Sequence, residues 1–263
     1  MKPVSSLPHE EAAHLRGLLF DLDDTVLTHG WLTQGAYDAL WAMHDAGLLL
    51  IPVTGRPFGW AEVIARQWPV AGCIAENGSL YVVRDGASLR VSDSCDESER
   101  LDRRNRLEQL GARVRSAVPD ARTTDDRYAR RSDFTWDIGE RAHMPDERVA
   151  AIIREIESAG ARWSRSSIHL HATFDGDDKA SGAIRFCARE LGEDEGSATS
   201  RFAFAGDSAN DAPCFSAFRT TFGVDNVRSA IARLSVPPRY VASRPMGDGF
   251  AEIAEELLGK RRA

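Results

Sequence analysis

The sequence contains very little lysine. Lysine occurs only at positions 2, 179 and 260, so 30 of the 33 basic residues are arginine. Lys179 is therefore the one interior lysine, and "DGDDKA" places acidic residues directly before it. A lysine offers a compact point charge that arginine does not. Taken alone, such a lysine would most often be a solvated residue at the start of a helix.

Long apolar runs and paired cysteines are also missing. No run approaches the roughly 20 apolar residues of a membrane helix, and residues 1–17 have no apolar segment for secretion, so we expect a cytoplasmic protein without a membrane partner. The cysteines are far apart and form no CxxC pair, which argues against a zinc site or a disulfide framework. We expect core residues or free thiols at the four positions, Cys73, Cys95, Cys187 and Cys214.

The charge balance argues against a further class of proteins, those that bind nucleic acid through general electrostatic attraction. The formal net charge is -7, which argues against a general attraction to nucleic acid. Residues 84–170 hold 17 Arg and 17 Asp or Glu, so the whole acidic excess lies in the two flanking segments. With 43% hydrophobic and 28% charged residues, the chain has the composition of a globular protein, and 263 residues suffice for about two domains. No pattern predicts an oligomeric state.

Strand-like and helix-like patterns alternate in both flanking segments. Apolar runs of strand length are separated by helical periodicity, with Thr33 as an N-cap and Pro57 at a helix start. Such alternation predicts a parallel sheet covered by helices on both faces. We predict strands within the ranges 16–23, 48–55, 71–79, 201–208, 220–224 and 239–243, and helices within 33–47, 57–68, 179–192, from 210, 227–234 and 249–260.

The middle segment follows another pattern. A hairpin turning at Asp85-Gly86 is followed by a helix, a strand at 133–139, a helix after Pro145, and one strand at 162–174. This order predicts an α+β module with antiparallel pairing. The fold class is therefore α/β, a Rossmann-like three-layer core with a parallel sheet, formed by residues 1–82 and 173–263, and an inserted α+β domain at 83–172.

Acidic and hydroxyl side chains gather where the core strands end. Asp21, Asp23, Thr54 and Asp207 all follow predicted strands, and ligands of open parallel sheets bind beyond these carboxyl ends. Clustered carboxylates repel one another, and Mg²⁺, which prefers oxygen ligands, would compensate their charge. A metal beside acids suggests phosphoryl chemistry. Any one of these residues alone is better explained as a turn residue, a helix cap or a strand end.

The sequence resembles the haloacid dehalogenase superfamily in its phosphatase branch. All four motifs of that family occur in order: "DLDDT" at 21–25, "VTGR" at 53–56, Lys179, and "GDSAND" at 206–211. The position of the inserted domain resembles the α/β-capped branch, which includes Cof-like, sucrose-phosphate and mannosyl-3-phosphoglycerate phosphatases. Asp24 stands where many members have glycine.

This resemblance implies the roles of the acidic residues. Asp21 would be the nucleophile that forms an aspartyl-phosphate, and Asp23 would be the general acid and base. Mg²⁺ would bind the Asp21 carboxylate, the Asp23 backbone carbonyl and the Asp207 carboxylate, with Asp211 beside it. In isolation, Asp211 could simply be an acidic residue in the first turn of a helix.

The same resemblance implies the phosphate-binding residues. Thr54 and the backbone N–H of Gly55 would hold phosphate oxygens at a helix amino end. Lys179 would supply positive charge to the transferring group, and Arg56 and Asn210 would assist. The inserted domain would be a cap that closes over the site and selects the leaving group.

The implied activity is Mg²⁺-dependent hydrolysis of a small phosphomonoester, with a sugar phosphate or phosphorylated glycoside as the substrate. A phosphomutase on the same scaffold is the first alternative. A phospho-accepting signalling domain is the second, although the Asp-x-Asp pair, the inserted domain and the late "GDSAND" argue against it. A sugar-phosphate sensor without activity is disfavoured because every acidic residue is intact.

Two features of the inserted domain have competing explanations. His169 and His171 share one face of a strand, which could bind a metal, although a half-exposed strand face explains the alternation better. Arg130 or Arg131 could bind a second anionic group, but clustered arginines usually form a solvated face.

Overall fold

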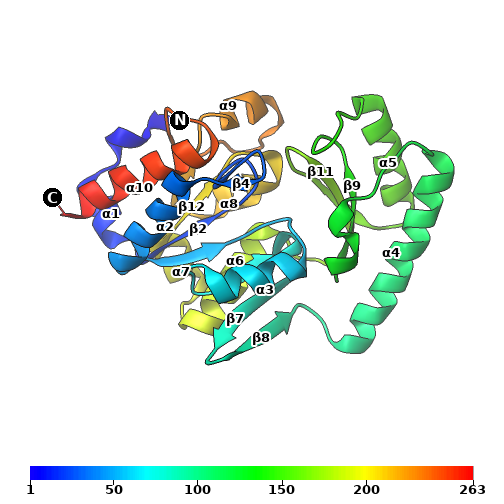
Figure 1. The fold of residues 1–263 in the computed structure, drawn as a ribbon, viewed down its shortest axis with the longest axis horizontal. Helices are drawn as coiled ribbons and strands as arrows, with labels where there is room; N and C mark the ends of the chain where they lie inside the picture. Colours follow the sequence, from blue (N-terminus) through cyan, green and yellow to red (C-terminus); the bar gives the residue numbers. More distant parts are fainter. Residues whose placement is uncertain (263) are drawn as a thin grey trace.

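The computed structural model describes residues 1–262 and divides them into two parts. Figure 1 shows a larger part in which helices cover a sheet, and a smaller part made of α4, α5, β9 and β11. The first and last labelled helices, α1 and α10, lie in the larger part, and the chain passes into the smaller part and back again. This arrangement is the core with an inserted module that the sequence predicts.

A six-stranded sheet forms the centre of the larger part. Its order is β1-β14-β13-β12-β2-β5, and every neighbouring pair is parallel. The central strands are buried at every residue because both faces are covered, which explains their continuous apolar sequences. The six strands are β1 Lys2–Pro3, β2 Gly17–Phe20, β5 Leu49–Pro52, β12 Phe202–Gly206, β13 Thr220–Gly223 and β14 Tyr240–Val241.

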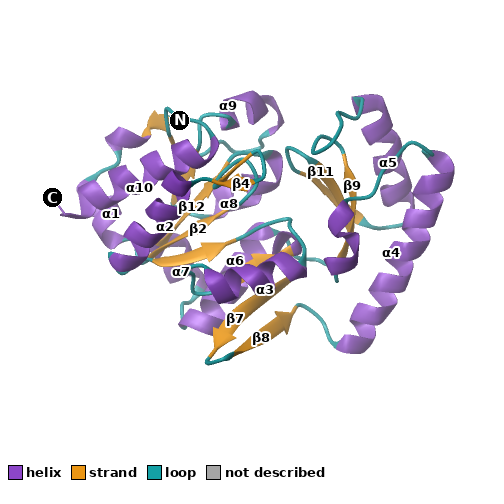
Figure 2. Ribbon diagram, viewed as in Figure 1, coloured by secondary structure: helices purple, strands orange, loops and turns teal. Residues whose placement is uncertain are grey.

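Helices pack on both faces of this sheet, as Figure 2 shows. On one face α2 and α10 lie together, and Leu40 and Leu257 belong to one hydrophobic cluster with Leu18 of β2. On the other face Phe186 of α6 joins a second cluster with Phe204 of β12. The predicted three layers are therefore confirmed. The helices of this part are α1 His9–His14, α2 Gln34–Asp45, α3 Phe58–Gln67, α6 Lys179–Leu191, α7 Glu195–Arg201, α8 Ala212–Ala217, α9 Val227–Ala230 and α10 Met246–Arg262.

The strand predicted at 71–79 starts a small sheet of its own. β6 (Cys73–Ala75) pairs antiparallel with β7 (Leu80–Asp85), which pairs with β8 (Ser88–Asp93), and one parallel bridge from Val53 to Ile74 ties β6 to the core. The β7–β8 hairpin packs on the core, where Tyr81 donates a hydrogen bond to Glu190 of α6. The predicted boundary between residues 82 and 83 falls inside β7. We propose that the inserted module begins with α4.

The inserted module has a hydrophobic cluster of its own. Leu110 of α4, Ile152 of α5 and Trp136 of β9 belong to it, and all are buried. Its three-stranded sheet has the order β10-β11-β9 and is antiparallel throughout. The elements are α4 Glu97–Ala117, β9 Asp133–Asp137, α5 Asp146–Ser158, β10 Arg162–Arg165 and β11 His169–Thr173.

The single strand predicted at 162–174 is wrong. The chain turns at residues 166–168 and makes the β10–β11 hairpin, because the Ser166 hydroxyl accepts hydrogen bonds from the backbone N–H groups of Ile168 and His169. Serine hydroxyls bond locally in turns, but they mark a turn less clearly than Asn-Gly or Pro-Gly. Residues 162–174 therefore contain no strong turn signal that would divide them into two strands.

Several short elements were not predicted. Besides β1, α1 and α7, they are the hairpin strands β3 Leu27–Thr28 and β4 Trp31–Leu32, and the 3₁₀ helices η1 Val4–Ser6, η2 Glu76–Gly78 and η3 Asp125–Ala129. The helix predicted from 210 begins with η4 Ala209–Asp211, and the helix predicted at 227–234 ends with η5 Ile231–Arg233. All four cysteines are free thiols, three of them buried, as expected. Within residues 1–262 no helix combines the length and apolarity needed to cross a bilayer.

Candidate active site at the carboxyl edge of the sheet

Three adjacent core strands deliver polar residues to one edge of the sheet. Asp21 follows β2, Thr54 lies just beyond β5, and Asp207 follows β12. These strands are neighbours in the order β12-β2-β5, so their carboxyl ends meet. All three side chains are buried, with exposed fractions of 3%, 0% and 4% in that order. The structure thus brings the residues of separate sequence motifs together.

Lys179 connects two of the acidic residues. It begins α6, where Asp178 forms a capping box with Ser181, and its Nζ lies 2.8 Å from Asp21 Oδ1 and 2.7 Å from Asp211 Oδ1. Burial lowers the pKa of Lys179, but the two carboxylates outweigh burial and hold that pKa above its ordinary value. The lysine is therefore a buried cation between two aspartates.

Asp21, Asp207 and Asp211 form a compact acidic cluster. Each can place one carboxylate oxygen within 4.8 Å of the others. Asp207 accepts hydrogen bonds from the Thr25 hydroxyl at 3.1 Å and from the Asn226 amide at 3.0 Å. Asp211 binds Lys179 through one oxygen and accepts from the Asp207 backbone N–H at 2.9 Å through the other. Asp211 is thus more fully hydrogen-bonded within the chain than Asp21.

The charge of this cluster suits a divalent cation. When all three carboxylates are ionised they carry -3 and Lys179 carries +1, which leaves -2 in a buried site. Burial, with the nearby carboxylates of Asp211 and Asp23, raises the pKa of Asp21 to about 7 despite Lys179. Burial and Asp211 likewise raise the pKa of Asp207 well above its ordinary value. The donors are oxygens, which Mg²⁺ prefers. The residues therefore fit such an ion.

These pKa shifts predict how cation affinity depends on pH. The folded metal-free protein holds protons that the unfolded chain has lost, so its stability should fall as pH rises from about 4 towards about 7. Because Mg²⁺ must displace those protons, its affinity should rise by up to about tenfold per pH unit for each proton displaced, and the part of the rise due to Asp21 should level off above about pH 7. Calorimetric titration with Mg²⁺ between about pH 5 and pH 8 measures this. An affinity independent of pH would contradict it.

Asp23 is held by Arg56. The Arg56 Nε lies 3.0 and 2.9 Å from the two Asp23 carboxylate oxygens, and a terminal nitrogen lies 2.7 Å from the first. Arg56 also binds Glu140 at 2.8 Å and approaches Asp126 at 3.7 Å, and both belong to the inserted module. Arg56, which the family resemblance assigns to phosphate, therefore links Asp23, the candidate general acid and base, to the module in this structure.

The remaining predicted phosphate-binding residues lie around the same edge. The Thr54 hydroxyl accepts a hydrogen bond from the Arg56 backbone N–H at 3.0 Å. Asn210 accepts from the Ser208 hydroxyl at 2.7 Å and donates to Asn77 at 3.2 Å. Sequence reasoning missed Asn77, which adopts a left-handed backbone with φ 54°. Its position in an Asn-Gly pair after a strand end was the available signal.

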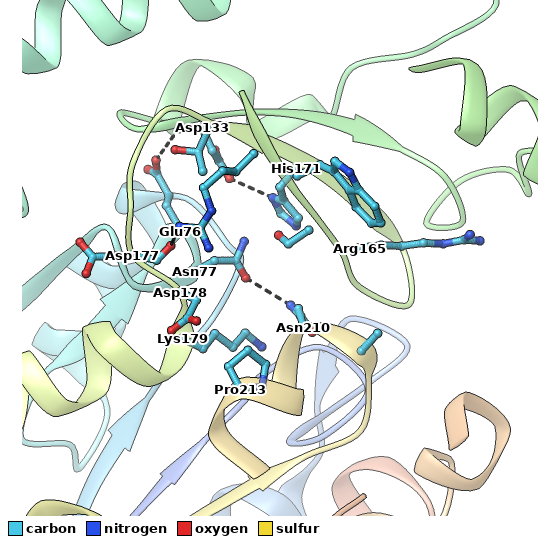
Figure 3. A pocket seen from close by; sticks show the side chains of 15 residues that line it. Glu76, Asn77, Asp133, Arg165, His171, Asp177, Asp178, Lys179, Asn210 and Pro213 are labelled. Carbon is cyan, nitrogen blue, oxygen red and sulfur yellow. Dashed lines mark hydrogen bonds and ion pairs between the residues drawn. The ribbon is translucent and has the colours of Figure 1, made fainter. Parts of the chain in front are cut away.

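A cavity of about 330 Å³ lies between the core and the inserted module. Lys179, Asn77 and Asn210 line it from the core, and His171 and Asp133 line it from the module, as Figure 3 shows. Its volume suits a small ligand. The cavity therefore joins the charged edge of the sheet to the polar surface of the module.

The two histidines of β11 are buried rather than half-exposed. Their exposed fractions are 1% for His169 and 2% for His171, so the expected half-exposed face is wrong. Each ring binds a carboxylate: His169 Nε2 lies 2.9 Å from Glu140, and His171 Nδ1 lies 2.9 Å from Asp133. The side chains belong to a polar layer between the module and the core, which the alternation alone did not reveal.

Arg130 is also buried, with 2% exposed, so the solvated face expected of the arginine cluster does not include it. It binds Asp133 at 3.0 Å and donates to the Gly55 carbonyl at 3.0 Å. Arg131 stacks over the ring of Phe58, with its guanidinium carbon 3.5 Å from the centroid. Both arginines therefore fasten the module to the core.

Glu76 provides the densest contact between the two parts. This core residue is 1% exposed, and its carboxylate accepts hydrogen bonds from the backbone N–H of Arg131 at 2.9 Å and from the hydroxyl of Ser132 at 2.6 Å. It also accepts from the backbone N–H of Phe58 at 2.9 Å. One carboxylate therefore holds the α3 start and the module loop together.

Comparisons with known proteins support the fold. Neither a protein-family model nor a curated protein matches the sequence. Among solved structures, the C-terminal domain of Candida albicans trehalose-6-phosphate phosphatase is 13% identical, with TM-score 0.72 and 98% of each chain covered. The sucrose-phosphatase of Synechocystis, solved with sucrose and phosphate, is 15% identical, with TM-score 0.62, 92% of this chain and 98% of that chain covered.

A third similar structure is a phosphatase of the haloalkanoate (HAD) enzyme superfamily from Bacteroides thetaiotaomicron. It is 19% identical, with TM-score 0.62, and the match covers 94% of this chain and 97% of that chain. All three matches extend through both the core and the inserted module, since each covers more than nine tenths of the chain. The chain therefore has the fold of the capped haloacid dehalogenase phosphatases.

Proposed function

We propose that this chain is a Mg²⁺-dependent phosphatase that hydrolyses a small phosphomonoester, a sugar phosphate or a phosphorylated glycoside. The observation that carries the proposal is the buried position of Lys179 between Asp21 and Asp211, beside Asp207 and open to a cavity of about 330 Å³. The sucrose-phosphatase and the trehalose-6-phosphate phosphatase with the same fold support the substrate class.

In the first step Asp21 acts as the nucleophile. One of its carboxylate oxygens forms a bond to phosphorus, and the bond between phosphorus and the ester oxygen breaks. Asp23 gives a proton to the departing alcohol oxygen. The product is an aspartyl-phosphate on Asp21, and the alcohol leaves towards the cap.

In the second step a water attacks the phosphorus of the aspartyl-phosphate. Asp23 accepts a proton from this water, the bond between Asp21 and phosphorus breaks, and inorganic phosphate is released. Mg²⁺ bound by Asp21, Asp207 and the Asp23 backbone carbonyl, with Asp211 beside it, would reduce the repulsion between anionic nucleophile and anionic phosphate.

Positive charge and backbone donors hold the phosphate. Lys179 offers its ammonium group, and Thr54 and the Gly55 N–H lie where β5 leads towards α3. Asn210, at 8% exposed, provides an amide at the cavity wall. These groups stabilise charge that develops on the phosphoryl oxygens, and they are already in place before substrate binds.

Asp23 has to separate from Arg56 to perform its role. Both of its oxygens accept hydrogen bonds from the guanidinium group. Asp23 must be released from these bonds to give a proton to the alcohol oxygen in the first step and to accept one from water in the second. We propose that substrate binding draws Arg56 away, and that Arg56 then assists in binding the phosphate.

Phosphate release tests this function. With Mg²⁺, the purified protein should release inorganic phosphate from p-nitrophenyl phosphate and from members of a sugar phosphate panel. EDTA should abolish the release, and excess Mg²⁺ should restore it, because the buried charge of -2 would otherwise be uncompensated. Phosphate that reappears on another carbon of the sugar would instead identify a phosphomutase. Stoichiometric labelling without turnover would identify a phospho-accepting domain.

A further inference from the structure

One nitrogen of a buried histidine has no partner. His171 Nε2 makes no hydrogen bond to any atom of residues 1–262, although the side chain is only 2% exposed. The ring lines the cavity opposite Lys179 and close to Asn77 (Figure 3). A buried polar atom without a partner is unusual and needs an explanation. The residues proposed to perform phosphoryl transfer do not use this nitrogen.

The other ring nitrogen determines the protonation of Nε2. His171 Nδ1 lies 2.9 Å from Asp133 Oδ2 and 3.0 Å from the Thr135 hydroxyl. Asp133 also accepts from Arg130 at 3.0 and 3.1 Å, so it is an ionised carboxylate that can only accept hydrogen bonds. Nδ1 must therefore carry the proton. Burial lowers the pKa of His171 to about 4, so at neutral pH the ring is neutral and Nε2 presents a lone pair.

The strand register in the module's sheet places His171, with its Nε2 lone pair, on the face that is turned towards the core. His171 pairs with Ser164 on β10 and with Thr135 on β9, and residues directly opposite in an antiparallel sheet share a face. This polar face lies against the cavity, whereas Leu170 and Phe134 on the other face belong to the hydrophobic cluster of the module. Register therefore places His171 on the wall that a leaving group would meet.

The ring also lies close to the phosphate-binding loop. A Cβ built on Gly55 would lie 3.0 Å from His171 Nε2, which is tighter than ordinary contact, so a side chain at position 55 would crowd the imidazole. A group bound by Nε2 must therefore be near the phosphate. It cannot be an oxygen of the phosphate dianion, because such an oxygen has no hydrogen to donate to a lone pair.

We propose that His171 Nε2 accepts a hydrogen bond from a hydroxyl of the leaving alcohol, close to the phosphorylated carbon. His171 is then a specificity-determining residue that selects polyol phosphates over alkyl phosphates. This inference rests on the proposed phosphatase function. A substrate without the hydroxyl leaves the buried acceptor unpaired, which should lower kcat/KM by about 10- to 100-fold.

A pair of substrates that differ by one hydroxyl tests the inference. Phosphate release is measured with Mg²⁺ from glycerol 1-phosphate, 1-propyl phosphate and p-nitrophenyl phosphate. The wild type should prefer glycerol 1-phosphate to 1-propyl phosphate by about 10-fold or more, and His171→Leu should bring the ratio close to one, chiefly through KM. Turnover of p-nitrophenyl phosphate, which has no such hydroxyl, should change much less.

The matched control is His143→Leu, an exposed histidine of the same module, which should keep the preference. An equal preference in His171→Leu and wild type, or no preference in the wild type, would overturn the inference. Absence of phosphate release from all three substrates in the wild type would instead overturn the proposed phosphatase function. The two failures are therefore distinguishable.

A second measurement does not depend on how His171→Leu folds. In Asp21→Asn, ¹⁵N NMR should show His171 Nε2 as an unprotonated ring nitrogen that responds to glycerol 1-phosphate and not to 1-propyl phosphate. A protonated Nε2, or an equal response to both compounds, would contradict the role. A histidine that only supports the fold would respond to neither compound.

Discussion

Asp21→Asn is expected to lower kcat for phosphomonoester hydrolysis by more than about 10⁴-fold. The amide has nearly the shape of the carboxylate but is too weak a nucleophile to form the bond to phosphorus. Asp21 is 3% exposed and lies 2.8 Å from Lys179, so the change also removes half of a buried ion pair. Steady-state phosphate release with Mg²⁺ measures the loss, and denaturant unfolding checks that the variant is folded.

The neighbouring Asp24→Asn is the matched control for this variant. Asp24 has a left-handed backbone with φ 57°, which asparagine adopts readily, and its backbone carbonyl accepts a hydrogen bond from Asn226. The same change of aspartate to asparagine, made at position 24, should therefore leave most of the phosphatase activity. Comparable losses in the two variants, or substantial activity in Asp21→Asn, would remove the proposed nucleophile.

Lys179→Met is expected to reduce both stability and activity. Methionine has a similar length, but it leaves Asp21 and Asp211 buried without their cation, and breaking a buried ion pair in this way costs about 3–5 kcal/mol in free energy of unfolding. Loss of a charge that stabilises the transferring phosphoryl group should lower kcat by about 10²- to 10³-fold or more. Urea unfolding and phosphate release measure the two effects.

Mg²⁺ and pH should modify the effect of Lys179→Met on stability. Without the lysine the carboxylates retain protons more strongly, so the loss should be larger at high pH and in EDTA than with Mg²⁺. Lys260→Met, near the end of α10, is the matched control and should change stability by less than about 0.5 kcal/mol. If Lys179→Met unfolds like the wild type in EDTA, the lysine is not the counter-ion of the aspartates.

Periodicity in the sequence was sufficient to predict the core. The strands at β2, β5 and β12 are apolar at nearly every residue because both faces are covered, and Thr33 caps α2 by accepting from the Ala36 N–H. Prediction failed where side-chain hydrogen bonds, and not apolar spacing, direct the chain. The turn at Ser166 is of this kind. Prediction also failed for β6, which leaves the main sheet and pairs through its backbone with β7.

The residues of the candidate site could be predicted from the sequence, but only some of the contacts between them could. Short motifs identified Asp21 and Asp207, because the ends of neighbouring parallel strands fix where such residues meet. The ion pair of Arg56 with Glu140 and the position of His171 beside Gly55 depend on how the inserted module rests on the core. Such contacts join residues far apart in sequence, so no local pattern encodes them.

The carboxylate of Glu76 has a consequence for the timing of turnover. Its bonds to the module hold the two parts together beside groups that are almost wholly inaccessible, so the two parts can separate only when those bonds break. If product leaves by that separation, opening competes with chemistry as the slowest step of turnover. A single side chain outside the reacting centre would thereby set the residence time of the product.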